Sequence, residues 1–299
     1  MTDTSDPILT LRAGALSLDL APRAGGVIAG FRHGDTLIMR PPDLPGLAAG
    51  NPRAGASWPL VPYSNRIRNG RFPWRGKQVQ LELDWLSKEH AIHGNGWRRP
   101  WTVHDRSASA VSLKQRHQGD GFWPFAYEAQ QSFALTPDGF TLWMAVTNTG
   151  AEPMPAGLGH HPYFHRTPDA TLCVTTREYW ENDAEKLPMR RVKVPSQLDF
   201  STRRVIDPLD LDGIFVGWTR PARIEWPDAG LTLDIAASAI FERLVIFIPG
   251  GQPFFAVEPV SHDTDAFNHL KDDTGVKILG PGESLQGDMS FTVRHAPRA

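Results

Sequence analysis

The sequence of 299 residues contains a single cysteine, Cys173, so no intrachain disulfide can form. A chain without a disulfide framework suits a reducing compartment, and we expect a cytoplasmic location. Cys173 lies in a strand-like run, residues 170–176. We interpret it as a small buried hydrophobe rather than as a reactive thiol.

Long apolar runs and an excess of one charge sign are also missing. No stretch of about 18 apolar residues occurs, so no membrane span is expected. The polar, acidic segment 1–6 does not resemble the basic start of a secretory signal. The formal net charge of -2 gives no global positive field that would attract nucleic acid or anionic lipid. We therefore expect a soluble protein with neither nucleic acid nor membrane as a partner.

Amphipathic segments of helical length are scarce, and the best candidate is a short one at residues 264–270. The dominant hydrophobic period is two, as where Leu16, Leu18 and Leu20 share one face. The alternation returns in residues 140–146, 231–235 and 291–293. Glycine and proline, 27 and 26 in number, recur between these runs, where turns are needed. The pattern predicts an all-β fold, an antiparallel sandwich or barrel of many strands with few short helices.

We find neither an internal repeat nor a low-complexity tract. Residues 40–56 are rich in proline, glycine and alanine without a strand pattern, and we predict a long surface loop leading into a site. The chemically capable motifs extend from Asn65 to Glu258. One domain over residues 1–299, with strands and loops that meet in one cleft, explains that spread more simply than two domains.

Polar, chemically capable residues interrupt good strand or turn patterns in several places. In residues 62–72, Asn65 and Arg66 offer hydrogen-bond donors, although a solvated basic turn explains this segment equally well. In residues 91–97, His93 precedes a glycine, which indicates a ring held where the backbone bends.

Two further segments carry a histidine pair and a carboxylate. Pro162 forces His161 into an extended conformation, and neighbours on a strand point to opposite faces, so His160 and His161 are not expected to serve one site equally. Glu258 ends an apolar run and precedes a proline. Partial burial would raise its pKa from about 4.3 and make it a better base, whereas the alternative is an exposed carboxylate at a sheet edge.

Together these segments resemble the aldose 1-epimerase family, also called galactose mutarotases, over about residues 9–293. The matching motifs are Asn65-Arg66-Ile67, His93-Gly94, His161-Pro162-Tyr163-Phe164 and Glu258-Pro259, with a weaker match at Asp212. Each motif alone is weak, but their common order over most of the chain is fairly specific. The sequence departs from the family in carrying His160 where asparagine is frequent.

The resemblance implies the family's large antiparallel β-sandwich, the galactose mutarotase-like supersandwich, and interconversion of the α and β anomers of a free aldose. Glu258 would take the proton of the anomeric hydroxyl and His161 would protonate the ring oxygen, on opposite sides of one ring. After rotation about C1–C2, the ring would close with the roles reversed. Asn65, Arg66, His93 and Asp212 would bind sugar hydroxyls, and neither a metal nor an organic cofactor is needed.

Trp97 lies in a turn-like, polar segment, and we expect its ring to cover the C–H face of a pyranose. The sequence does not identify the aldose or the oligomeric state.

The same residues are compatible with several other functions. A hexose-6-phosphate 1-epimerase would use a basic cluster to bind phosphate: Arg66, Arg68, Arg71, Arg98 and Arg99. A metal site would draw on His93, His160, His161 and His262, although they lack the usual ligand spacing. Asp212 and Glu258 would form the carboxylate pair of a glycosidase. A non-catalytic sugar-binding module is the alternative from another class.

Overall fold

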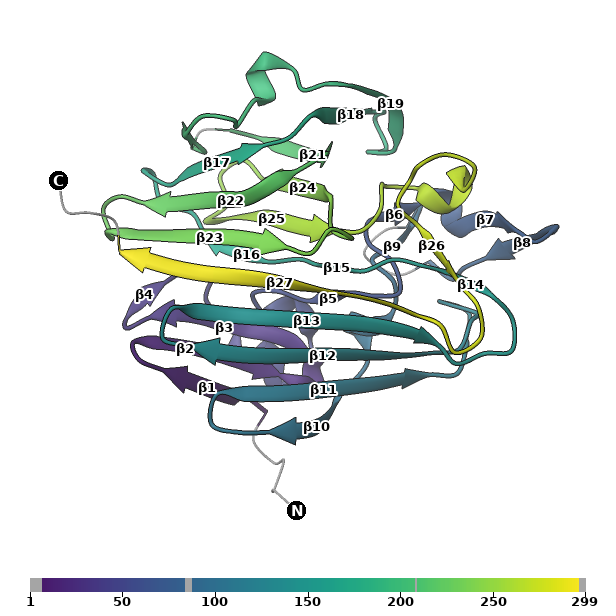
Figure 1. The fold of residues 1–299 in the computed structure, drawn as a ribbon, viewed down its shortest axis with the longest axis horizontal. Helices are drawn as coiled ribbons and strands as arrows, with labels where there is room; N and C mark the ends of the chain where they lie inside the picture. Colours follow the sequence, from purple (N-terminus) through teal and green to yellow (C-terminus); the bar gives the residue numbers. More distant parts are fainter. Residues whose placement is uncertain (1–6, 84–87, 208, 296–299) are drawn as a thin grey trace.

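The computed structural model describes residues 7–83, 88–207 and 209–295. It consists mainly of antiparallel strands. The strand pairs of both large sheets are antiparallel. Figure 1 shows one of these sheets nearly face-on, with the second sheet packed behind it. The all-β sandwich predicted from the alternating pattern is therefore confirmed.

The first large sheet has nine strands, in the order β10-β11-β12-β13-β27-β23-β22-β17-β20. Its strands are β10 (Thr102–Arg106), β11 (Ala110–His117), β12 (Tyr127–Thr136), β13 (Gly139–Asn148), β27 (Ser284–His295), β23 (Leu231–Ala237), β22 (Thr219–Trp226), β17 (Thr171–Thr175) and β20 (Arg204–Val205). The alternating runs near residues 140, 231 and 291 form β13, β23 and β27, as predicted.

The second large sheet, which we call the site sheet, has eight strands in the order β19-β18-β21-β24-β25-β15-β5, with β16 also paired to β25. Its strands are β19 (Pro188–Lys193), β18 (Glu178–Asn182), β21 (Leu211–Val216), β24 (Arg243–Ile248), β25 (Phe254–Val260), β15 (Gly159–His160), β5 (Pro59–Leu60) and β16 (Tyr163–His165).

Smaller strand groups complete the fold. They are a four-stranded sheet of β1 (Leu9–Ala13), β2 (Leu16–Ala21), β3 (Val27–His33) and β4 (Thr36–Leu37), and the pairs β14 (Met154–Ala156) with β26 (Lys277–Leu279), β6 (Arg66–Ile67) with β9 (Ala91–Ile92), and β7 (Arg71–Trp74) with β8 (Lys77–Gln80).

Helices among the described residues are short, as expected. They are α1 (Leu44–Ala48) and the 3-10 turns η1 (Pro22–Ala24), η2 (Pro52–Ala54), η3 (Arg68–Gly70), η4 (Gly96–Arg98), η5 (Ser196–Leu198) and η6 (Ala266–His269). The expected helix at residues 264–270 is only the single turn η6, because Asp265 before it has a left-handed backbone, φ 54°. The predicted loop at residues 40–56 contains α1 and η2.

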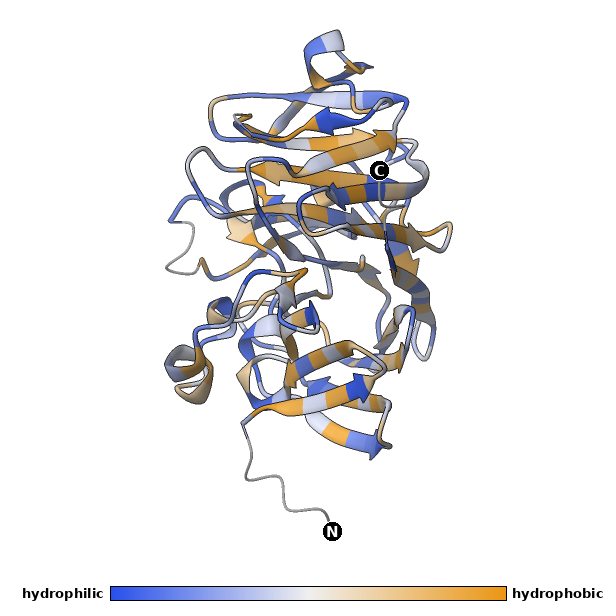
Figure 2. Ribbon diagram, turned by 90° about the vertical axis from the view of Figure 1, so that its left-hand side faces the viewer, coloured by the Kyte–Doolittle hydropathy of each residue, from blue (hydrophilic) through white to orange (hydrophobic). Residues whose placement is uncertain are grey.

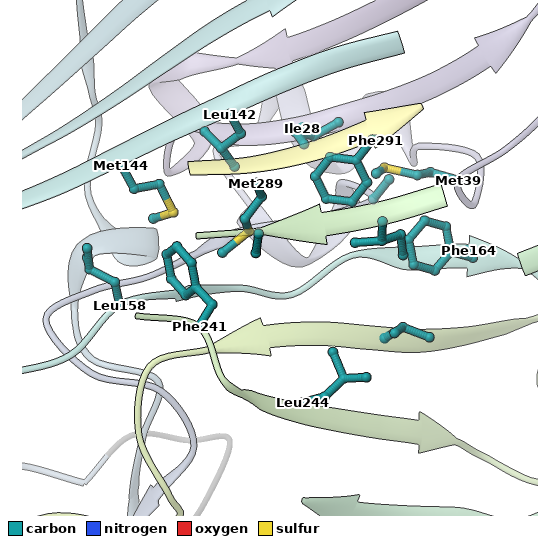
Figure 3. Close-up of a cluster of buried hydrophobic side chains, with 14 of the residues drawn as sticks. Ile28, Met39, Leu142, Met144, Leu158, Phe164, Phe241, Leu244, Met289 and Phe291 are labelled. Atoms are coloured by element: carbon teal, nitrogen blue, oxygen red, sulfur yellow. The ribbon is translucent and has the colours of Figure 1, made fainter. Parts of the chain in front are cut away.

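The main hydrophobic core lies between the two large sheets. In Figure 3, Met144 of β13 and Met289 and Phe291 of β27 approach Phe164 of β16 and Leu244 of β24. These side chains are fully buried, so their apolar area stabilises the sandwich at about 25 cal/mol per Å². Apolar and polar residues alternate along many strands in Figure 2, as the two faces of a sheet require.

The structure also tests the expectations for Cys173 and for membrane-spanning helices. Cys173 is only half-buried, with its Sγ 3.6 Å from the carbonyl oxygen of Ser201, so the prediction of a buried hydrophobe is wrong. Its strand β17 lies near the edge of the nine-stranded sheet, where one face is less covered. Within the described ranges, we find no helix of the length and apolarity needed to cross a membrane.

Candidate active site

Strand β25 carries the carboxylate to the side of the site sheet away from the main core. Its residues alternate, so Phe255 and Val257 join the main core while Ala256 and Glu258 face the opposite way. Glu258 is 2% exposed. Burial, reinforced by the negative charge of Asp212, raises the pKa of Glu258 well above its usual value. This carboxyl group therefore holds its proton more tightly than a surface glutamate does.

His161 lies directly against Glu258. Its Nε2 is 3.3 Å from Glu258 Oε1, and its ring packs on Trp58 and Tyr163 with centroids 4.7 and 4.6 Å apart. Burial is the largest of several effects that lower the pKa of His161 well below its usual value. Because burial disfavours the charged form of each group, it favours a protonated Glu258 beside a neutral His161.

A tight turn positions Arg66 and His93 beside this pair. The backbone N–H of Asn65 donates to His93 Nδ1 at 3.0 Å, which leaves Nε2 as the protonated nitrogen of a neutral His93. Burial, together with Arg66 and Arg98, lowers the pKa of His93 to about 3, so the ring is neutral at neutral pH. The rings of His93 and His161 lie 5.3 Å apart, edge to face.

Gly94, next to His93, is required by the backbone. Its φ is 67°, in the left-handed region, and a Cβ there would lie 2.3 Å from the carbonyl oxygen of Val61. The turn that holds His93 thus depends on a residue without a side chain.

Arg66 and Asp212 form a second polar pair. Asn65 Oδ1 accepts from the backbone N–H and from Nη1 of Arg66, at 2.9 and 3.2 Å, which fixes the guanidinium. Arg66 Nη2 lies 3.8 Å from Asp212 Oδ2 at the start of β21, and both side chains are about a quarter exposed. They present a hydrogen-bond donor and an acceptor that remain accessible to a ligand.

Trp97 is 3% exposed, and its ring lies 6.0 Å from that of Trp58 in a stacked arrangement. It also lines a cavity of about 500 Å³ together with Arg98 and Phe122. The ring thus contacts the aromatic group beside His161, and most of it is covered.

Two histidines of the alternative metal site, His160 and His262, have separate partners. His160 is fully buried, between Ser57 Oγ and Gln131 Oε1, on the other side of the strand from His161, as the alternation predicted. His262 Nε2 accepts from the backbone N–H of Ser64 at 3.0 Å. In the part of the chain that the structure describes, no three His, Cys, Asp or Glu side chains converge in a way that would hold a metal ion.

Of the predicted phosphate cluster, Arg66 and Arg98 both act on His93, whereas the other three arginines have partners of their own. Arg68 forms ion pairs with three carboxylates: Asp183, Glu185 and Asp265. Arg99 pairs with Asp120, and Arg71 hydrogen-bonds Gln80.

Arg40 is the first residue of segment 40–56, for which the sequence predicts a loop leading into a site, and it lies beside Tyr163 and His161. Its guanidinium lies 4.1 Å above the ring of Tyr163, and its Nε donates to the carbonyl oxygen of Gly55 at 3.0 Å. Its charge helps to lower the pKa of His161. Arg40 follows β4 at the start of a segment without periodicity, so only the tertiary structure brings it to the histidine.

Comparison with known proteins identifies the family of the chain. The family model of aldose 1-epimerase matches residues 7–292. The uncharacterized protein YphB of Escherichia coli K12 is 32% identical over 295 residues, which are 96% of this chain and 98% of that protein. The uncharacterized protein YihR of the same organism is 32% identical over 237 residues, 74% of this chain and 72% of that protein.

Solved structures give the same result. One, from Escherichia coli K12, carries a provisional aldose 1-epimerase designation; it is 31% identical with a TM-score of 0.88, and the match covers 96% of this chain and 99% of that one. A galactose mutarotase-like protein from Clostridium acetobutylicum is 20% identical with a TM-score of 0.84, covering 96% and 95%.

The fold defines a galactose mutarotase-like β-sandwich protein. The chain belongs to the aldose 1-epimerase family, which carries with it a role in carbohydrate epimerisation.

Proposed function

We propose that the protein is an aldose 1-epimerase that interconverts the α and β anomers of a free aldose. The observation that carries this proposal is the contact between His161 and Glu258, two buried groups with pKa values shifted in opposite directions. Groups whose protonation states are tuned apart in this way are typical acid–base partners.

The reacting form of the pair has its proton on His161 and an ionised Glu258, and it is reached from the neutral pair by transfer of one proton from Glu258 Oε1 to His161 Nε2 across the 3.3 Å contact. Glu258 accepts the proton of the anomeric hydroxyl, and His161 donates its proton to the ring oxygen while the C1–O5 bond breaks. The open chain carries an aldehyde at C1, Glu258 is protonated and His161 is neutral. After rotation about C1–C2, the ring oxygen attacks the other face of the aldehyde and both protons return.

This scheme conserves the proton count, because the pair holds one proton before and after ring opening. The two side chains touch at 3.3 Å, so the expected arrangement on opposite sides of a sugar ring requires the pair to separate. The anomeric oxygen and the ring oxygen are bonded to the same carbon. A small separation of the pair therefore allows each group to reach its own oxygen.

The remaining polar groups are suited to binding. Neutral His93 offers an N–H donor, and Arg66 with Asp212 offers a donor and an acceptor for hydroxyls remote from C1. Because Asn65 Oδ1 is engaged by Arg66, we assign Asn65 to orienting the guanidinium. Trp97 backs the aromatic group beside His161.

Two observations favour a free aldose over the alternatives. Arg68 and Arg99 are paired with carboxylates, which leaves them poorly suited to bind a sugar phosphate. A non-catalytic module would need neither the acid nor the base, yet both are present and in contact.

The test is anomer exchange by proton NMR with glucose, galactose, xylose, arabinose and glucose 6-phosphate, each against its spontaneous rate. We expect acceleration of at least one free sugar, and no acceleration by Glu258→Gln purified in the same way. Acceleration of the phosphate sugar alone would support the phosphate alternative. No acceleration by folded protein would contradict the proposal.

A further inference from the structure

Tyr163 of β16 lies on the same face of the site sheet as the proposed acid and base. It pairs with Ala256 of β25, and residues opposite each other in an antiparallel pair point to the same side of a sheet. Ala256 precedes Glu258 by two positions in its strand, so these two also share a face. Tyr163 therefore belongs to the surface on which the proposed chemistry takes place.

The ring of Tyr163 is fixed by its neighbours. Its centroid lies 4.6 Å from the ring of His161, 5.2 Å from that of Trp58 and 4.8 Å from that of Phe254. The guanidinium carbon of Arg40 lies 4.1 Å from the same centroid. A ring packed in this way holds its hydroxyl at a defined point, as a binding site requires.

The hydroxyl is the part of Tyr163 that is left for a ligand. Tyr163 is 8% exposed. Among the residues that the structure describes, its Oη accepts and donates no hydrogen bond, and it is not one of the buried polar atoms that lack a partner, so it remains accessible. Burial, together with the negative charge of Glu258, raises the pKa of Tyr163. The hydroxyl therefore keeps its proton and can donate a hydrogen bond.

Strand pairing places Tyr163 in one row with Asp212. Ala256, opposite Tyr163, is also opposite Phe247 of β24. Phe247 in turn is opposite Asp212 of β21, so the row spans about 14 Å at a strand spacing of about 4.8 Å. Phe247 is partly exposed between the two polar side chains, and its ring suits the C–H face of a sugar. Glu258 lies beside this row, two residues after Ala256.

The chemistry at C1 indicates which sugar atom meets the phenol. C1 is bonded to O1, to the ring oxygen and to C2. In the proposed mechanism Glu258 serves O1 and His161 serves the ring oxygen, which leaves C2 and its hydroxyl. Tyr163 lies against His161 and in the row of Asp212, between the place of C1 and that of the hydroxyls remote from it. The atom that reaches its Oη is therefore the oxygen on C2.

We propose that Tyr163 donates a hydrogen bond to the 2-hydroxyl of the aldose and holds C2 in place while C1 rotates. This inference rests on the proposed function. The open chain has lost the ring that fixed its shape, and rotation about C1–C2 presents the other face of the aldehyde only if the rest of the chain stays bound. Tyr163 is then a residue that selects aldoses with a 2-hydroxyl, and it does not take part in the proton transfers.

The experiment measures anomer exchange of glucose and galactose and of their 2-deoxy analogues, each against its spontaneous rate. For Tyr163→Phe, which keeps the ring, we expect kcat/KM for the better hexose to fall about tenfold. The value for its 2-deoxy analogue should not change, because that sugar lacks the partner of the missing hydroxyl. The 3-deoxy analogue keeps the 2-hydroxyl, so it should lose as much as the parent hexose.

Tyr179→Phe is the matched control. Tyr179 of β18 packs against Phe215 of the main core, with ring centroids 5.1 Å apart. Its loss of a hydroxyl should leave the ratio of the hexose to its 2-deoxy analogue unchanged. An equal loss on the parent and the 2-deoxy sugar in Tyr163→Phe, or no loss on either, would overturn the inference.

If the wild type accelerates none of these sugars, the proposed function fails, and binding then decides the inference separately. The Kd values of glucose and 2-deoxyglucose are measured by NMR titration for the wild type and for Tyr163→Phe. Weaker binding of 2-deoxyglucose than of glucose, with a difference that disappears in Tyr163→Phe, would support it. Equal binding of the two sugars by the wild type, or no binding of either, would overturn it.

Discussion

At the scale of single residues, the proposed mechanism depends on two titratable side chains, Glu258 and His161, whose burial favours their neutral forms. A surface glutamate beside a surface histidine would simply form an ion pair at neutral pH. Here burial raises the pKa of Glu258 and lowers that of His161, so one proton is retained by the pair over a wide pH range.

The pH profile of kcat/KM follows from these directions. Activity requires one proton on the pair. Below the lowered pKa of His161 a second proton is bound, and above the raised pKa of Glu258 the single proton is lost. We expect a bell with its acidic limb below 6.5 and its alkaline limb well above 4.5. A profile that falls with rising pH through 4.5 would contradict the assignment.

The buried carboxyl group also has a cost in stability. A folded-state pKa above the unfolded value gives stability that is present at low pH and is lost as pH rises. We therefore expect Glu258→Gln to raise the melting temperature relative to the wild type, with a gain that grows from pH 4 to pH 8. Thermal unfolding followed by circular dichroism measures this, and a gain that does not depend on pH would contradict it.

Arg40 provides a further test at this scale. Its charge helps to lower the pKa of His161, so Arg40→Met should move the acidic limb of kcat/KM to higher pH. Arg32→Met, at a cation paired with Asp19, is the matched control and should leave the limb in place. A loss of activity at all pH values without a shift would indicate that Arg40 only supports the packing of Tyr163.

At the scale of the elements, strand alternation and tight turns position the side chains that we propose for catalysis. Alternation in β25 separates Glu258 from the core-facing Val257, and the turn at Gly94 holds His93. The bend at His93 was predicted from the glycine that follows it, whereas the apolar run before Glu258 did not show which face the carboxylate takes. The helix expected at residues 264–270 is shortened to the single turn η6. Asp265 before it has a left-handed backbone, and its side chain accepts a hydrogen bond from the backbone N–H of Arg68.

The glycine of the turn should resist substitution. In Gly94→Ala, the Cβ meets the carbonyl oxygen of Val61 in a left-handed backbone, so we expect a loss of about 2–3 kcal/mol in the free energy of unfolding. Gly34→Ala is the matched control, since Gly34 has φ 55° and open space around it. It should cost about 1 kcal/mol. Equal losses in urea unfolding would show that steric contact at Gly94 is unimportant.

At the scale of the whole molecule, the sandwich brings residues far apart in sequence to one site. The sequence predicted the strands, their antiparallel pairing and the motifs around Arg66, His93, His161 and Glu258. It predicted that segment 40–56 leads into a site, but not that Arg40 lies near His161 or that Trp58 packs on the His161 ring. Those depend on which segments pack together across the site sheet, and residues 40–56 have no periodicity to indicate it. The division into a single domain stays a prediction.

The proposed chemistry needs only protons that the chain itself holds, and His93, His160 and His262 are each engaged with separate partners. We therefore expect treatment with a chelator, followed by dialysis, to leave anomer exchange unchanged. A loss that zinc restores would contradict the cofactor-free mechanism.

The central claim is that His161 and Glu258 are the acid and base. The most direct test measures anomer exchange of the best sugar by NMR for His161→Asn, His160→Asn and Glu258→Gln. We expect kcat to fall by about 10²–10⁴ for His161→Asn and Glu258→Gln. For His160→Asn the loss should be much smaller, because His160 only contacts Ser57 and Gln131. Equal losses at the two histidines, or full activity without Glu258, would contradict it.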